Sequence, residues 1–259
     1  MNTAQRAQAI AAAAEPFESL LGSTTTDDLL GWLRAELGEA EALDRWIDHG
    51  PAKTKALPPP TILHIVSGNT PHAALQSLIG GLLLGSRNLV KLPRSGLAEV
   101  QAFLERLPEP LRSAVETATD LPDVWLASAG AVIVYGSDET IAALRARVAP
   151  GQTFIGHGHK ASLGIVWDDP GFASCAGAAR DASLFDQQGC LSPQVFYVRE
   201  SQPGWARRYA EHLAAAMDRF IRTHPRSPLE VAEKAEIANL RAAYRFRAAG
   251  DLRVGLWEG

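Results

Sequence analysis

The sequence predicts an α/β protein with a parallel sheet, and three observations support this class. Short apolar runs alternate along 259 residues with segments whose apolar residues recur at helical spacing. Glycine, proline and asparagine turns separate these segments. The hydrophobic content of 46% suffices for one large core or two smaller ones. Strands that alternate with helices usually pair in parallel, because each helix returns the chain to the same end of the sheet.

The first part of the chain, residues 1–57, predicts a helical cap. Its apolar residues recur at helical spacing among acidic ones, and the pattern ends at His49-Gly50-Pro51. The positions that carry this spacing are Leu29, Leu30, Leu33, Leu37, Leu43, Trp46 and Ile47. The proline-rich run Leu57-Pro58-Pro59-Pro60 links the cap to the next part.

Residues 58–167 predict the parallel sheet. The apolar run at 62–66 indicates a buried strand, and a turn at 67–71 leads into an apolar helix that ends near Gly85. The elements expected after it are a strand at 88–92, a helix at 95–107, a strand at 131–135, a helix at 138–148, and strands at 153–155 and 162–167.

Residues 168–259 predict the beginning of a second α/β domain. A helix at 172–184 precedes a polar turn and a strand at 194–198, and long helices follow at 205–223 and 228–249.

Composition and charge exclude several classes of function. The net charge of -4 and the lack of a basic cluster argue against nucleic acid as a partner and favour a small molecule. The longest apolar stretch, 73–84, is too short to span a bilayer. Only two cysteines and no signal segment at the start suggest reduced thiols, so we expect a cytoplasmic protein.

Cys190 is the strongest candidate for chemistry. It lies in the polar run Phe185-Asp186-Gln187-Gln188-Gly189-Cys190-Leu191-Ser192, between a predicted helix and a predicted strand. Active sites of α/β proteins usually open at such places, and a thiol there is suited to nucleophilic attack. The alternative is a buried free cysteine, as most cysteines are.

Other turns at strand ends also carry candidates. Asn69 could donate its amide N–H to a developing oxyanion, or it could cap the next helix. Gly136 and Ser137 could bind a phosphate at a helix start, although a serine cap has the same sequence. Lys91 could contact a ribose or phosphate, or it could simply be solvated. The usual glycine-rich phosphate-loop sequences are absent.

His157 and His159 flank Gly158 and could chelate a metal ion if a third ligand joined them. No carboxylate or cysteine pair nearby in the sequence completes such a site, so we expect no metal. A role in general acid–base catalysis is the better interpretation of these imidazoles.

The order of these turns resembles that of the aldehyde dehydrogenase superfamily, from about Ile62 to Val198. Within it, residues 187–194 are similar to the acyl-CoA reductase (LuxC) family, the fatty acid reductases of bacterial bioluminescence. The motifs that carry the resemblance are Asn69-x-Pro71, Asn88-Leu89-Val90-Lys91, Gly136-Ser137-x-Glu139, Gly158-His159-Lys160-Ala161-Ser162 and Gln188-x-Cys190.

The resemblance implies a Rossmann-type nicotinamide-binding domain at 58–167 and the start of a catalytic domain. Cys190 would attack a fatty acyl-CoA or acyl-protein thioester, and Asn69 would hold the oxyanion. NADPH, with NADH as the alternative, would then deliver hydride to release an aldehyde. Lys91 would contact the adenosine ribose or its phosphate, Arg94 would favour NADPH, and Gly136-Ser137 would bind the pyrophosphate. A homo-oligomer, or a complex with an acyl-donating partner, is expected.

Two departures from the superfamily pattern bear on the reaction. Aligned on Lys160, Gly156 stands where aldehyde-oxidising members have the glutamate that activates water. Without that carboxylate, an acyl-cysteine should hydrolyse slowly, which suits thioester reduction. The later Glu-x-Phe-Gly-Pro region is not visible, so we expect a fragment or a truncated relative. The alternatives are a non-catalytic binding protein of the same fold, or a cysteine acyltransferase or thioesterase without redox chemistry.

Overall fold

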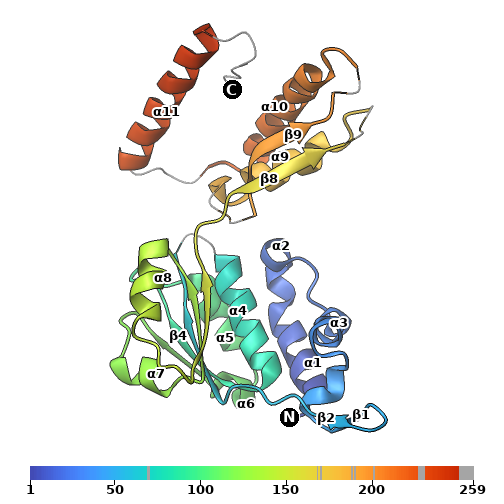
Figure 1. Ribbon diagram of the computed structural model, residues 1–259, viewed down its shortest axis with the longest axis vertical. Coiled ribbons are helices and arrows are strands. Elements are labelled where there is room, and N and C mark those ends of the chain that lie inside the picture. Colours follow the sequence, from blue (N-terminus) through green and yellow to red (C-terminus); the bar gives the residue numbers. More distant parts are fainter. Residues whose placement is uncertain are drawn as a thin grey trace. The chain divides into compact units, whose positions relative to one another are not determined.

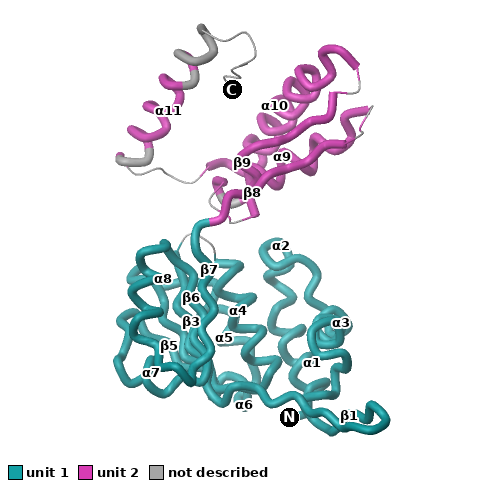
Figure 2. The backbone as a smooth tube through the Cα atoms, in the orientation of Figure 1, with its two compact units in different colours: residues 1–159 teal, residues 160–259 magenta. Residues whose placement is uncertain are grey.

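The computed structural model describes residues 1–68, 71–167, 169, 171–187, 189, 191–200, 202–226 and 231–250. The chain divides into two compact units, residues 1–159 and 160–259 (Figure 2). The predicted helical cap and the main parallel sheet both lie in the first unit. The domain boundaries predicted at residues 57 and 167 stay predictions.

The first unit begins with short helices. Their bounds are α1 (Thr3–Ala14), the 3-10 helix η1 (Glu15–Phe17), α2 (Glu18–Leu21), α3 (Thr26–Leu37) and the 3-10 helix η2 (Ala40–Leu43). Capping boxes start the two longer helices: Asn2 with Gln5 for α1, and Thr25 with Asp28 for α3. The predicted helical character of this region is therefore present, and its helix starts follow from local sequence.

The end of the predicted helical cap is a strand pair and not a helix. Ile47 does not continue a helix but begins β1 (Ile47–Asp48), which pairs in antiparallel fashion with β2 (Lys53–Thr54). Gly50 lies in the connecting turn with φ +79°, a conformation that favours glycine. Trp46 is 63% exposed, so its place in the helical spacing was coincidental.

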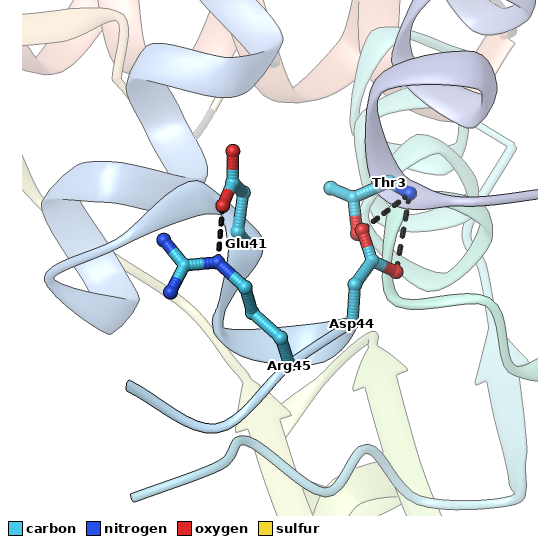
Figure 3. A network of polar contacts seen from close by, with 4 residues as sticks. All are labelled: Thr3, Glu41, Asp44 and Arg45. Carbon is cyan, nitrogen blue, oxygen red and sulfur yellow. Dashed lines mark hydrogen bonds and ion pairs between the residues drawn. The ribbon is translucent and has the colours of Figure 1, made fainter. Parts of the chain in front are cut away.

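Polar contacts attach the start of α1 to the segment after η2 (Figure 3). The backbone N–H of Thr3 donates to both carboxylate oxygens of Asp44, at 3.3 and 2.9 Å. Glu41 and Arg45 form an ion pair beside this contact. The Asp44 carboxylate satisfies a free helix N–H and carries negative charge at the positive end of α1.

The main sheet has five parallel strands in the order β5-β4-β3-β6-β7. The elements in chain order are β3 (Thr61–Ile65), α4 (Pro71–Leu84), β4 (Arg87–Lys91), α5 (Ala98–Arg106), α6 (Glu109–Arg112), β5 (Val115–Ala118), α7 (Asp123–Ser128), β6 (Ala131–Tyr135), α8 (Asp138–Arg145) and β7 (Thr153–His157). The strands and helices predicted up to residue 157 are present, with ends shifted by a few residues, whereas the strand predicted at 162–167 lies in a separate sheet of the second unit. The prediction omitted β5, α6 and α7, because the β5 pattern is mainly exposed and resembles a loop.

Helices cover the two faces of this sheet separately, as Figure 1 shows. Helices α4 and α5 pack with α1 on one face, where Leu75, Val100 and Phe103 are fully buried. Helices α7 and α8 pack on the other face, against Val132 and Val134. This arrangement leaves the face of β6 and β7 on the α4 side less covered, and Ile155 there is 43% exposed.

A buried polar cluster joins β3 to α4 and β4. The Asn88 amide donates to the Ser86 carbonyl at 2.7 Å, so its Oδ1 faces His64 and accepts from Nε2–H at 3.0 Å. Nδ1 of His64 therefore accepts from the Ser77 hydroxyl at 2.7 Å. Burial, partly opposed by the Asn88 hydrogen bond, lowers the pKa of His64 from 6.5 to about 4. The neutral imidazole is thus fully hydrogen-bonded within the core.

The second unit contains a smaller parallel pair of strands, and residues of its first two α-helices pack against them. Its elements are β8 (Ser162–Val166), α9 (Cys175–Ser183), the 3-10 helix η3 (Leu184–Gln187), β9 (Pro193–Val198), α10 (Trp205–Thr223) and α11 (Val231–Gly250). Helix α9 begins later than predicted. Phe172 has φ 54° and lies outside the helix, where its ring stacks on His212 with centroids 4.2 Å apart.

Among the described residues, no helix is both long enough and apolar enough to cross a membrane.

Candidate functional site

The candidate site lies at the carboxyl edge of the five-stranded sheet. Strands β3 and β6 lie side by side at its centre, and the chain proceeds outward from them in opposite directions, to β4 and β5 and to β7. Ligands of open α/β sheets bind in the crevice at such a reversal of strand order. Ile65 at the end of β3 pairs with Lys91 on one side and with Val134 on the other. The sheet therefore brings predicted site residues from two described segments, those that follow β4 and β6, to one edge.

Gly136 and Ser137 follow β6 directly and open α8, as predicted. Ser137 caps the helix, since its hydroxyl oxygen accepts from the Thr140 N–H at 3.3 Å. The same hydroxyl contacts the Glu139 carboxylate, and this hydrogen bond is the main reason that the pKa of Glu139 is lowered. The helix cap interpretation of Ser137 is thus confirmed, and its role toward a phosphate stays a prediction.

The start of α8 carries more negative charge than a simple phosphate site. Asp138 and Glu139 both lie in the first turn, where they offset the partial positive charge of the helix end. The Asp138 carboxylate accepts from the backbone N–H of His159 at 3.2 Å. A phosphate-bearing ligand at this edge therefore needs cations from elsewhere.

Lys91 and Arg94 supply cations near the same edge. Lys91 ends β4 half-buried, and its carbonyl accepts from the Val66 N–H at 3.1 Å, which ties its backbone to the end of β3. Arg94 is exposed three residues later. Two strand spacings of about 4.8 Å separate β4 from β6, so Lys91 lies roughly 10 Å across the sheet from the start of α8. That span suits an extended dinucleotide better than a single phosphate.

The two predicted catalytic residues, Asn69 and Cys190, lie outside the described residues. The elements beside them are described: β3 ends before Asn69, and β9 begins after Cys190. The other cysteine, Cys175, lies among the described residues. Cys175 is buried against α10, and its Sγ lies 3.9 Å from the Tyr209 carbonyl oxygen. Burial raises the pKa of the Cys175 thiol, which makes it a poor nucleophile.

Gly156 lies in β7 with no room for a side chain. A Cβ atom there would approach Cγ2 of Ile141 to 2.9 Å, closer than real contacts allow. At the position where the superfamily resemblance predicts that the water-activating glutamate is missing, a side chain of α8 thus fills the space.

The two histidines are not brought together as ligands. The His157 ring stacks on Tyr135, with centroids 4.6 Å apart. His159 contacts Asp138 through its backbone. In the part of the chain that the structure describes, no three His, Cys, Asp or Glu side chains are grouped to hold a metal ion.

A groove of about 780 Å³ lies in the first unit, and sequence patterns did not reveal it. We call it the α3–α4 groove. Its lining comes from α3 and α4 and from the less covered face of the sheet: Trp32, Leu33, Ile79, Gly80, Leu83, Ile133, Tyr135, Ile155 and His157. In the sequence, the groove is indicated only by the alternation of Ile133 and Tyr135 in β6. Local patterns could not show more, because the groove depends on where α3 packs.

Comparisons with known proteins find related sequences. The chain is 26% identical over 240 residues to a long-chain acyl-protein thioester reductase of Aliivibrio fischeri, covering 85% of this chain and 49% of that protein. It is 28% identical over 181 residues to such a reductase of Photobacterium leiognathi, covering 64% and 38%. The chain thus spans about half the length of the curated relatives it matches, or less.

Solved structures show the same fold. An NAD-dependent benzaldehyde dehydrogenase from Corynebacterium glutamicum matches 84% of this chain and 55% of its own, with a TM-score of 0.53 and 17% identity. The predicted aldehyde-dehydrogenase-like α/β fold is thereby confirmed. The family model described as acyl-CoA reductase (LuxC) matches residues 3–251, and the chain therefore belongs to that family.

Proposed function

We propose that this chain takes part in the reduction of a fatty acyl thioester to an aldehyde, through an acyl-Cys190 intermediate and with NADPH as the hydride donor. One observation carries the proposal: in a member of the acyl-CoA reductase family, the reversal of strand order brings Lys91 and Gly136-Ser137 to one edge. The related reductases act, by their names, on long-chain acyl-protein thioesters, so such a thioester or acyl-CoA is the proposed substrate.

The chain's own residues divide the work as follows. The Cys190 thiolate attacks the thioester carbonyl; a bond forms from its sulfur to the acyl carbon, and the bond to the leaving thiol breaks. The amide N–H of Asn69 stabilises the oxyanion of the tetrahedral intermediate. When the acyl carbon receives hydride, its bond to the Cys190 sulfur would break, which would release the aldehyde and restore the thiolate.

The residues at the sheet edge fit a nicotinamide dinucleotide, which supplies the hydride when bound. Lys91 and Arg94 contact the adenosine ribose and its 2′-phosphate, and this second contact favours NADPH over NADH. Gly136 and Ser137 bind the pyrophosphate. The two cations matter here because Asp138 and Glu139 make the start of α8 a weak anion site by itself.

The lack of a carboxylate at Gly156 supports reduction over hydrolysis. Water near an acyl-cysteine attacks slowly unless a base takes its proton. Because Ile141 fills the space beside Gly156, no side chain at this position can act as that base. An acyl-Cys190 would therefore persist long enough to accept hydride.

We further propose that residues 58–167 bind the cofactor and that 168–259 belong to the catalytic domain. The protein would act in the cytoplasm, as a homo-oligomer or beside a partner that donates the acyl group.

The experiment measures acyl labelling and cofactor binding separately. Incubation with tetradecanoyl-CoA should label wild type and Cys175→Ala, but not Cys190→Ala, by mass spectrometry. NADPH fluorescence should report binding that Lys91→Ala weakens. Labelling that persists in Cys190→Ala would overturn the nucleophile. Fast release of free fatty acid without cofactor would indicate a thioesterase. If the protein is not labelled and does not bind the cofactor, it is a non-catalytic protein of this fold.

A further inference from the structure

We propose that the α3–α4 groove holds the acyl chain of the substrate, so that residues of the first unit determine which chain lengths bind. This inference rests on the proposed function, because it takes an acyl thioester as the ligand. It adds a binding site and the residues that set its specificity.

The groove exists because the sheet is only partly covered. Helices α4 and α5 pack over the β3 side of the sheet, and α3 packs against α1 rather than over β6 and β7. Ile133 and Ile155 are therefore left as an apolar floor between the sheet edge and α4. Apolar surface that is gathered in this way, and is also hollowed, is typical of a binding site.

The dimensions fit one long apolar chain. The lining runs from Ile62, near the amino end of the sheet, to Tyr135 and His157 at its carboxyl end. Ile62 pairs with Ala131, four residues before Tyr135, which corresponds to roughly 13 Å at about 3.3 Å per strand residue. The volume of about 780 Å³ lies within the range of small-molecule sites.

The polarity of the groove indicates which way the ligand lies. The sheet residues of its lining are apolar until Tyr135 and His157, whose rings stack at the carboxyl end. Gly136, at the proposed cofactor edge, follows Tyr135 directly. An acyl chain with its tail near Ile62 would thus present its thioester end at the edge where the cofactor is proposed to bind.

Charge in the lining favours a neutral head group. Asp28 and Glu36 of α3 both line the groove, and they would repel the carboxylate of a free fatty acid. A thioester carries no such charge. The groove is therefore expected to bind acyl thioesters in preference to the corresponding acids.

Gly80 keeps the groove open beside Trp32. A Cβ atom on Gly80 would lie 3.3 Å from Cη2 of Trp32, so any larger side chain there must occupy groove space or displace the indole. We expect Gly80→Leu to shorten the longest chain that binds well.

The test uses neutral acyl thioesters of N-acetylcysteamine and the full chain with Cys190→Ala, which removes covalent capture. Calorimetry would compare butanoyl, octanoyl and tetradecanoyl thioesters. In the otherwise unchanged protein, affinity should rise by up to roughly fourfold for each buried CH₂ group. Ile155→Glu should remove this dependence and weaken tetradecanoyl binding at least tenfold, because it places a charge in the apolar floor. Gly80→Leu should spare butanoyl binding and weaken only the longest chain.

Leu57→Glu is the matched control, because Leu57 is an apolar residue 84% exposed outside the groove. It should bind like the parent. Circular dichroism would verify that each variant folds. Equal dependence on chain length in the parent and in Ile155→Glu would overturn the groove assignment. A loss of self-association in Ile155→Glu would also overturn the groove assignment, since it would mean that a second copy of the chain covers the groove.

Failure of the proposed function gives a different result. If the groove is correct and the reductase chemistry is wrong, chain-length-dependent binding remains while wild type shows no acylation of Cys190. If the groove is wrong and the chemistry is correct, Ile155→Glu acylates Cys190 with the same preference for long chains as wild type.

Discussion

Protonation of His64 should make the first unit sensitive to acid. The imidazole is fully buried, and its neutral form accepts from Ser77 and donates to Asn88. Burial lowers the pKa of His64 to about 4, whereas the unfolded chain has the ordinary value of 6.5. Between these values the unfolded state binds the proton and the folded state does not. The free energy of unfolding therefore decreases as the pH falls from about 6.5 to about 4, and it is unaffected by this group above that window.

The size of the effect follows from the difference between the two pKa values. Each unit corresponds to about 1.4 kcal/mol, so the full loss is about 3 kcal/mol below pH 4, and about 2 kcal/mol is lost by pH 5. That is a large share of a typical folding free energy of roughly 5–15 kcal/mol. The unit should therefore unfold much more readily in weak acid than at neutral pH.

Comparison with His64→Gln isolates this contribution. The glutamine amide can still donate toward Asn88, but it does not titrate, so groups that titrate in both proteins cancel in the comparison. Urea unfolding at pH 7, 6 and 5 should show wild type losing about 2 kcal/mol more than the variant. Proton NMR should show the His64 ring neutral down to about pH 4. Parallel stability curves, or a ring that titrates near 6.5, would refute the buried neutral imidazole.

Three further predictions concern packing and the site. Gly81→Ala should destabilise the protein by about 3 kcal/mol in urea unfolding, because its Cβ would lie 1.9 Å from Oδ1 of Asn88. Gly31→Ala is its control, as a Cβ there meets nothing within 4 Å, and it should stabilise helix α3 slightly. Lys91→Ala should raise the Michaelis constant for NADPH more than it lowers the turnover number, measured by nicotinamide absorbance in an active form of the enzyme. Asn69→Ala should slow acylation about a hundredfold in single-turnover labelling.

Each of these predictions has a contrary outcome. Equal stability changes in the two glycine variants would mean that the Asn88 contact is easily relieved. An unchanged Michaelis constant in Lys91→Ala would place the cofactor elsewhere. Normal acylation with only about 1 kcal/mol lost on replacing Asn69 would make that residue a helix cap.

The local sequence by itself determined the order and class of most elements. Apolar runs such as Leu89-Val90 in β4 must be buried wherever they lie, and Thr25 with Asp28 satisfies helix N–H groups without help from distant residues. The motif order also placed Gly136 and Ser137 at a helix start, and the structure places them there. Local patterns failed at Ile47, where pairing with Thr54 replaced helical spacing.

Only the tertiary structure decided which of these segments meet. Strand pairing between β3 and β6 puts Ile65 opposite Val134 although they lie 69 positions apart in the sequence, and no local pattern encodes that pairing. The neutral state of His64 depends on partners from α4 and β4, and the α3–α4 groove depends on which face of the sheet the helices leave uncovered. Burial and coverage are properties of packed elements, whose contacts join distant positions in the chain. A residue type can therefore suggest chemistry, but its environment becomes fixed only when the elements pack.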